Sequence, residues 1–369
     1  MLYRLAILVA KELMSYLRDP RTRVILIGPP LMQLVIFSFA ATLEVRNVDI
    51  AVLDQDTGPL SQTFMDRVSA ASFVGHIVPV TDVTRLQELI DRREVLLGLR
   101  FAPDFSRSIE VGQAAVVQVL IDGRRANAGQ ITLSYLAVVA AQLGTELHEQ
   151  RLGVRIADPV LTQHWFNPNL IYQWFIVPGL SGVLAMMIAL VVTALSIARE
   201  REMGTFDQLL VSPMTPLEII IGKTIPALII GAVLASLMIA AAVLLFRVPF
   251  SGSFGLLFLS LLLFMLSVVG IGLMVSSVCR TQQQAILGAF MTAVPLILIS
   301  GFATPVENMP WWLQYAAEAN PLKHYLLIIQ GSFLKAFPLQ EMLANSAPMA
   351  LIALVTLSVA TLFVKSRLQ

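Results

Sequence analysis

The sequence predicts a membrane all-α protein of six helices with an inserted extracytoplasmic α/β domain. Three observations lead to this fold class: 57% of the 369 residues are hydrophobic, only 13% are charged, and six long stretches carry no charge. Soluble domains carry about 25% charged residues. The excess of apolar residues is too large for one soluble core, so lipid is the expected solvent for much of the chain.

The six uncharged stretches are each long enough to cross a bilayer, which takes about 20 apolar residues. They comprise residues 24–43, 170–198, 224–246, 248–279, 281–306 and 342–364. Helices in the core of a soluble protein seldom run this long without a charge, which disfavours a soluble helical fold. No cleavable signal peptide of ordinary form precedes the first stretch, so we expect residues 23–43 to remain as a membrane anchor.

The orientation follows from the lysines and arginines in the short segments between spans. Eleven lie on one side: Arg4, Lys11, Arg18, Arg21, Arg23, Arg199, Arg201, Lys223, Arg280, Lys365 and Arg367. Three lie on the other: Arg247, Lys323 and Lys335. Because positive charge concentrates on the cytoplasmic side, both termini are expected in the cytoplasm.

Residues 1–22 are predicted to form a cytoplasmic amphipathic helix. On a helical wheel, one third carries the polar residues Arg4, Lys11, Glu12, Ser15, Arg18 and Asp19, and the far side carries Leu5, Val9, Leu13, Tyr16 and Leu17. This pattern favours a helix on the cytoplasmic leaflet, ended by Pro20. A simple basic leader that sets topology is the alternative.

Residues 44–169 have the composition of a soluble domain. Strands are predicted at 48–53, 73–78, 95–101 and 116–121, with helices between them and a long helix over 124–151. Asp82 is expected to cap the helix that follows it. This βαβ rhythm predicts a small α/β domain outside the cytoplasm. No hydrolase or metalloprotease motif is present, and His76, His148 and His164 are interpreted as structural or solvated.

A short charged segment, 199–222, connects the second and third spans on the cytoplasmic side. Gly222-Lys223-Thr224 resembles the end of a phosphate-binding loop, but that motif requires a glycine at position 217, which is leucine. The chain is therefore not expected to bind ATP. Lys223 is interpreted as the positive anchor at the start of the third span.

Four features together resemble one family, the permeases of type-2 ABC exporters (ABC-2 type), in the bacterial branch with a large extracytoplasmic domain. They are Lys11-Glu12 with Arg18-Asp19-Pro20-Arg21, residues 51–56 with 118–123 of the insertion, the segment 199–213 followed by Gly222-Lys223, and residues 300–310 with Asn320-Pro321-Leu322. The resemblance covers essentially the whole chain. It implies a membrane all-α six-helix permease with an inserted extracytoplasmic α/β domain.

The resemblance also implies roles for particular residues. An ATPase-coupling helix would include Arg199, Glu200, Arg201, Glu202, Met203, Gly204, Thr205, Phe206, Leu209 and Leu210, and an elbow helix beside it would include Lys11, Glu12 and Arg18. An outer re-entrant segment, 303–325, would be shaped by Gly301, Pro305, Glu307, Pro310, Trp311, Asn320 and Pro321. Its tryptophans suit a membrane interface, and its prolines break helices there.

The implied assembly is a dimer of permeases, formed with an identical or a sister subunit, that docks two ABC ATPase subunits. ATP and Mg²⁺ would bind to the ATPase, and no cofactor is expected on this chain. A periplasmic adaptor is a further expected partner. The implied function is efflux from a bacterial inner membrane, and the uncharged spans favour apolar or amphipathic cargo, such as drugs or lipids, over ions.

Three alternatives remain open at the level of the sequence. The first is a membrane-anchored receptor or scaffold that acts through its outer domain. The second is a permease for lipid-linked saccharides, against which the large insertion argues. The third is a membrane enzyme, for which the sequence shows no site.

Overall fold

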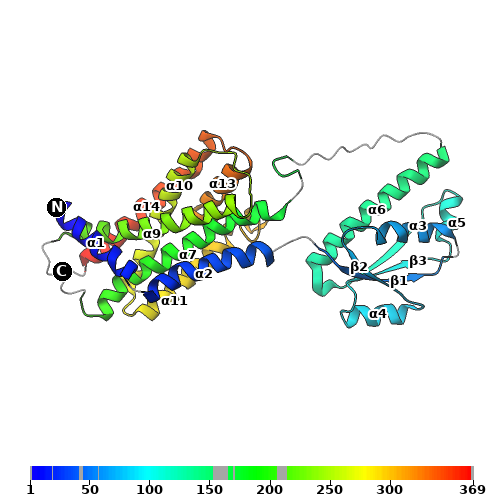
Figure 1. Ribbon diagram of the computed structural model, residues 1–369, viewed down its shortest axis with the longest axis horizontal. Coiled ribbons are helices and arrows are strands. Elements are labelled where there is room, and N and C mark those ends of the chain that lie inside the picture. The colour runs from blue at the N-terminus through cyan, green and yellow to red at the C-terminus, as the bar shows by residue number, and fades with distance from the viewer. Residues whose placement is uncertain are drawn as a thin grey trace. The chain divides into compact units, whose positions relative to one another are not determined.

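The structure, a computed structural model, describes residues 2–18, 20–40, 45–56, 58–152, 165–168, 171–205 and 214–366. It divides into two units, which are described separately (Figure 1). One comprises Met1–Ala41 with His164–Gln369 and is helical. The other, Thr42–Gln163, contains a β-sheet.

The helical unit contains nine described α-helices: α1 (Leu2–Arg18), α2 (Pro20–Ala40), α7 (Tyr172–Glu202), α9 (Pro216–Leu244), α10 (Phe254–Val278), α11 (Gln282–Leu298), α12 (Trp311–Glu318), α13 (Pro321–Leu334) and α14 (Leu339–Ser366). Among them α7, α9, α10 and α14 are long and apolar enough to cross a membrane. The apolar runs of α2 and α11 are shorter by the same measure. The protein is thus mostly helical with several spanning helices, as the sequence predicts.

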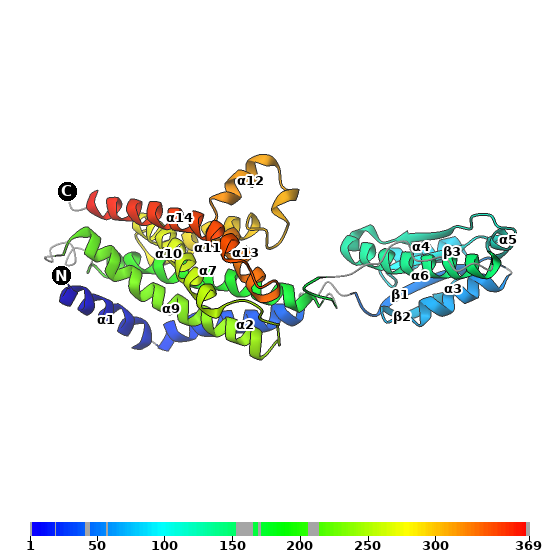
Figure 2. The same ribbon diagram turned by 90° about the horizontal axis from the view of Figure 1, so that it is seen from above.

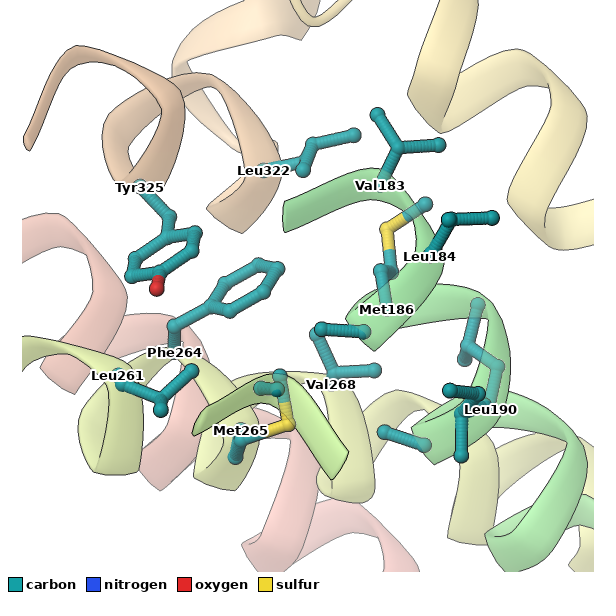
Figure 3. Packing of buried hydrophobic residues seen from close by; sticks show 14 of the residues in the cluster. Val183, Leu184, Met186, Leu190, Leu261, Phe264, Met265, Val268, Leu322 and Tyr325 are labelled. Carbon is teal, nitrogen blue, oxygen red and sulfur yellow. The ribbon is translucent and has the colours of Figure 1, made fainter. Parts of the chain in front are cut away.

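Helix α7 forms the centre of the helical unit and packs against α2, α9, α10, α11 and α13. In its most apolar stretch 83% of the residues are buried inside the protein, compared with 17% in α14. Figure 3 shows Met186 and Leu190 of α7 facing Val268 of α10, near the parallel rings of Phe264 and Tyr325, whose centroids lie 4.3 Å apart. Close packing of this kind holds helices together where lipid is as apolar as the side chains.

Short helices between α11 and α14 occupy the region predicted as re-entrant. A 3₁₀ turn (Val306–Asn308) leads to α12 and then to α13. The predicted segment ends at residue 325, whereas α13 continues to Leu334 and buries one face that includes Ile328, Ile329 and Phe333. Helix α13 therefore extends beyond the end of the predicted segment.

The second unit contains β1 (Val48–Asp54), α3 (Pro59–Ser69), β2 (Val74–Pro79), α4 (Val83–Asp91), β3 (Leu97–Phe101), α5 (Phe105–Glu110), β4 (Val117–Ile121), a 3₁₀ turn (Gly123–Arg125) and α6 (Ala126–Leu152). The strand order is β2-β1-β3-β4; β1 is parallel to both neighbours, and β4 is antiparallel to β3. Strands thus occur where the sequence predicts them, and Asp82 caps α4 by accepting a 2.7 Å hydrogen bond from the Arg85 backbone N–H.

Consecutive apolar residues in β1 cover both faces of this sheet. Ile50 and Val52 face a cluster with α3, α5 and α6, whereas Ala51 and Leu53 face α4. Two of this unit's ion pairs hold α6 and the 3₁₀ turn before it. Arg67 of α3 donates two hydrogen bonds, of 3.0 and 2.6 Å, to Glu146 of α6.

The second ion pair joins Asp122 to Arg124, whose Nε lies 2.8 Å from Asp122 Oδ1. The hydrogen bonds that Arg124 donates outweigh burial and hold the pKa of the Asp122 carboxyl below its usual value. The 3₁₀ turn before α6 is therefore fixed by a carboxylate that stays ionised.

Candidate functional site: a buried charge cluster between α1, α7 and α9

Helix α1 lies beside α9 in both views (Figures 1 and 2). The contact is close because position 222 of α9 is glycine: a Cβ there would lie 2.3 Å from Leu8 Cδ2. Leu8 and Glu12 face α9 and are 5% and 8% exposed, whereas Tyr3 is 79% exposed. The face of α1 buried in the protein is therefore the border between its polar and apolar sides.

Lys223, the residue after this glycine, is fully buried inside the protein. Its Nζ lies 3.2 Å from Glu12 Oε1 of α1 and 3.0 Å from Glu200 Oε2 of α7. It also donates to the hydroxyl and carbonyl oxygens of Ser196, at 3.3 and 3.4 Å. The interpretation of Lys223 as a membrane-surface anchor is wrong, because its ammonium group is enclosed by three helices instead of reaching the interface.

Lys11 adds a fourth charge, with its Nζ 3.5 Å from Glu200 Oε1. Lys11, Glu12, Glu200 and Lys223 are referred to below as the charge cluster. Its two positive and two negative side chains are formally neutral in sum. The side chains of Glu200 and Glu12 are only 7% and 11% exposed, whereas that of Lys11 is 61% exposed. Neutrality matters here because an unpaired charge is costly to bury.

The same last turn of α7 also holds the junction between α10 and α11. Arg201 Nη1 donates to the carbonyl of Ser277 in the last turn of α10, at 2.6 Å, and to that of Cys279 just after the helix, at 3.1 Å. Glu202 accepts a 2.6 Å hydrogen bond from the Gln282 backbone N–H, at the start of α11. Arg199 lies 3.4 Å from the Ser15 hydroxyl of α1. One helical turn therefore contacts four other helices.

The residues after this turn are the exposed part of the predicted coupling segment. Met203 is 59% exposed, and Gly204 adopts a left-handed φ of +67° that ends the helix. The Thr205 backbone N–H then donates to the Glu200 carbonyl at 2.9 Å. Phe206, Leu209 and Leu210, which were predicted to belong to the same segment, lie outside the described residues. Arg18, the third predicted elbow residue, is exposed on α1.

The predicted re-entrant residues lie at the other end of the helical unit. Asn320 is fully buried: its Oδ1 accepts from the Leu322 backbone N–H at 3.0 Å, and its Nδ2 donates to the Leu296 carbonyl of α11 at 2.6 Å. Its neighbour Pro321 begins α13. The other predicted residues lie in the turns that precede this one: Gly301 with a φ of +89°, Pro305 and Pro310 before short helices, and the exposed Glu307 and Trp311.

Among the buried polar residues that sequence reasoning missed are Ser196 and His324. His324 is 4% exposed, and its ring nitrogens lie 2.9 Å from the Glu318 carbonyl and 3.3 Å from Asn345 Oδ1. The available signal for Ser196 was its position inside a long apolar run, whereas His324 directly follows Lys323 and offers no such signal. Within the described residues, no group of three or more His, Cys, Asp or Glu side chains is placed to hold a metal ion.

Comparison with known proteins identifies the family of the chain. A family described as "ABC-2 family transporter protein" matches residues 21–362. The chain is 42% identical to the probable multidrug ABC transporter permease YbhR of Escherichia coli K12, over 98% of each chain. It is 29% identical to YbhS of the same organism, over 90% of this chain and 88% of that one. The linearmycin resistance permease protein LnrN of Bacillus subtilis is 20% identical over 85% and 86%.

These relatives are permeases, the transport subunits of ABC transporters, whose ATPase is a separate subunit. A family match across nearly the whole chain and a relative at 42% identity show the family directly. The chain therefore belongs to the ABC-2 transporter family, as a membrane-spanning permease subunit.

Proposed function

We propose that this permease exports apolar or amphipathic molecules, drug-like or lipid, from the cytoplasm or inner leaflet of a bacterial inner membrane. Two ABC ATPase subunits, which bind ATP and Mg²⁺, would drive two permeases. The names of the relatives support this cargo class, since YbhR and YbhS are named as probable multidrug permeases. The single observation that carries the coupling role is the charge cluster directly before an exposed turn.

Six spans follow if α2 and α11 also cross the bilayer. At about 1.5 Å per residue, the 21 residues of α2 extend about 32 Å and the 17 residues of α11 about 26 Å. A hydrocarbon core is about 30 Å thick. Both helices therefore have nearly the required length, although their apolar runs are shorter.

The end that carries the charge cluster would face the cytoplasm. This end holds α1, the last turn of α7 and the last turn of α14, and it carries most of the basic residues of the short segments. Both termini would then be cytoplasmic. The α/β unit, inserted between α2 and α7, would lie outside the cytoplasm, where a periplasmic adaptor could bind it.

Coupling would pass from the exposed turn to the charge cluster. An ATPase that contacts Met203 and Gly204 would displace the end of α7, and Glu200 would carry that displacement to Lys11 and Lys223. Glu200 is too deeply buried to form the contact surface, so its role would be transmission. A buried ion pair suits transmission because its geometry is narrowly defined and costly to break.

The translocation path would run between two permeases along α7 and α11. Most of α7 is buried within its own chain, so its contribution is a half-buried stripe of Met187, Val191 and Leu195, four residues apart. Helix α11 would contribute its exposed apolar face, which includes Leu287 and Met291. Both surfaces are uncharged, which suits apolar or amphipathic cargo.

The test is reconstitution with the cognate ATPase in proteoliposomes. Met203→Glu would place a charge in the ATPase contact and should weaken ATPase binding at least tenfold. The matched control is Val116→Glu, at an exposed valine of the α/β unit. Glu200→Gln should retain ATPase binding but lose drug-stimulated hydrolysis and transport of an amphipathic dye. Wild-type binding by Met203→Glu, or wild-type stimulation in Glu200→Gln, would contradict the proposal.

A further inference from the structure

The α/β unit contains a cavity that the transport function does not explain. It has a volume of ≈ 720 Å³ and lies between α6, α5 and strands β3 and β4. Ligand pockets have volumes of about 300–1,000 Å³, and most of their lining is apolar with a few polar groups. The cavity is therefore large enough for a small organic molecule.

Apolar side chains form its floor and walls. Leu99 and Val119 of the sheet line one side, Phe105 and Ile109 of α5 a second, and Leu136 of α6 a third. Leu99 and Leu136 are almost completely buried in the core, whereas Val119 and Ile109 stay half-exposed. The cavity is thus a continuation of the hydrophobic core that the protein itself does not fill.

Small residues on α6 keep the cavity open. Ala137, Ala140 and Gly144 lie three and four residues apart, on one face of the helix, and line the space. A Cβ at Gly144 would meet no atom within 4 Å. Glycine in a helix costs about 1 kcal/mol relative to alanine. Close packing does not require a glycine at position 144, so its effect is to leave space inside the cavity.

The mouth of the cavity is polar and positively charged. Arg151, His148 and Gln113 line it, and no Asp or Glu of the described chain does so. The Arg151 guanidinium rests against Gly112, and its hydrogen bond within the described residues is a long one, 3.4 Å, from Nη1 to the Ile109 carbonyl. A guanidinium has five N–H donors in a planar fork that binds a carboxylate with two parallel hydrogen bonds.

We propose that this cavity binds a small amphiphile with an apolar body and an acidic head group, such as a medium-chain carboxylic acid. The body would lie along the wall formed by Ala140 and Gly144, and the carboxylate would pair with Arg151. The alternative occupant is a β-strand of another protein added to the edge of the sheet at β4. Such a strand would pair with the β4 backbone and present no anion to Arg151, so the charge at the mouth favours the acidic amphiphile.

The experiment uses the full-length permease in nanodiscs and a diazirine derivative of dodecanoic acid. After irradiation, mass spectrometry locates the labelled peptides. Label is expected within residues 113–151. Decanoic acid should compete for it, and methyl decanoate should compete at least tenfold less well, because the ester cannot form the charged pair.

Two variants test the two parts of the site. Gly144→Phe fills the cavity and should abolish labelling of this region, whereas Val138→Phe, at an exposed α6 residue outside the cavity, should not. Arg151→Gln should weaken labelling roughly tenfold and Arg151→Lys less, with the exposed Arg107→Gln as the control. Arg151 is exposed, so its replacement leaves the core intact.

Four outcomes would overturn the proposal. They are label confined to the membrane helices, equal labelling of Gly144→Phe and wild type, equal competition by acid and ester, and equal labelling of Arg151→Gln and Arg107→Gln. Occupation of the cavity by a second copy of the chain would also count against it, and would appear as the absence of label in the assembled dimer. None of these results depends on ATPase coupling, so the proposed transport function is tested separately.

Discussion

Replacing Lys223 by methionine is the sharpest perturbation of the charge cluster. Methionine has a similar length and no charge, so the carboxylates of Glu12 and Glu200 lose their shared buried cation. Removing one member of a buried ion pair costs about 3–5 kcal/mol. For a unit of roughly 250 residues, 1 kcal/mol lowers the melting temperature by about 2–4 °C. We therefore expect Lys223→Met to lower it by about 6–20 °C.

Two further variants show whether the loss comes from uncompensated charge. Adding Glu12→Gln restores neutrality, since Lys11 and Glu200 then remain as a pair. The double variant should recover about 0.5–3 kcal/mol of the loss, the usual range of coupling between contacting residues. Lys11→Gln should cost less than about 1 kcal/mol, because the Lys11 side chain is 61% exposed and exposed ion pairs contribute little.

The assay is the fraction of monodisperse permease that survives heating in detergent, measured by size-exclusion chromatography. The expected order of stability is wild type, Lys11→Gln, the double variant and then Lys223→Met. If Lys223→Met were as stable as Lys11→Gln, or if Glu12→Gln worsened Lys223→Met, the cluster would not be a neutral unit held by Lys223. Either result would refute the reasoning.

Three further predictions concern other contacts. Gly222→Leu should detach α1 from α9 and expose α1 to protease, and Leu8→Ala in the same chain should partly restore protection; no restoration would exclude this contact as the cause. Asp122→Asn should destabilise the α/β unit at neutral pH, measured by hydrogen exchange. Arg124 lowers the folded pKa of Asp122, so the difference in stability between wild type and Asp122→Asn should shrink as the pH falls below about 4. A stability difference that stays constant from pH 7 to pH 3 would contradict the pKa argument. Asn320→Ala leaves buried backbone groups unpaired and should lower the free energy of unfolding by about 1–3 kcal/mol, seen as a lower melting temperature in the heating assay. An unchanged melting temperature would be inconsistent with that role of Asn320.

The features that the sequence predicts well are local ones. A long apolar run indicates a spanning helix, and the short apolar run over residues 48–53 indicates a strand, because both depend on neighbours within a few positions. Asp82 could be identified as a cap because capping joins residues three positions apart. Such patterns give the helical unit and the sheet before any contact is known.

The burial of Lys223 could not be predicted from local patterns. Its partner Glu12 is 211 positions away in the chain, so no periodicity connects them. In isolation, a lysine at the edge of an apolar run indicates a membrane-surface anchor, and only the packing of α1 and α7 on α9 buries it. Helix α13 is a related case: its buried face up to Phe333 packs against α7 and α10, and no local pattern indicates those contacts.

Glu200 holds two different parts of the molecule at once. Its carboxylate joins the charge cluster, and its backbone carbonyl accepts the Thr205 N–H that closes the end of α7. The last turn of α7 therefore cannot unwind by one residue without also releasing α1 and α9. A force applied at Thr205 is therefore expected to move the joined ends of α1, α7 and α9 as one body.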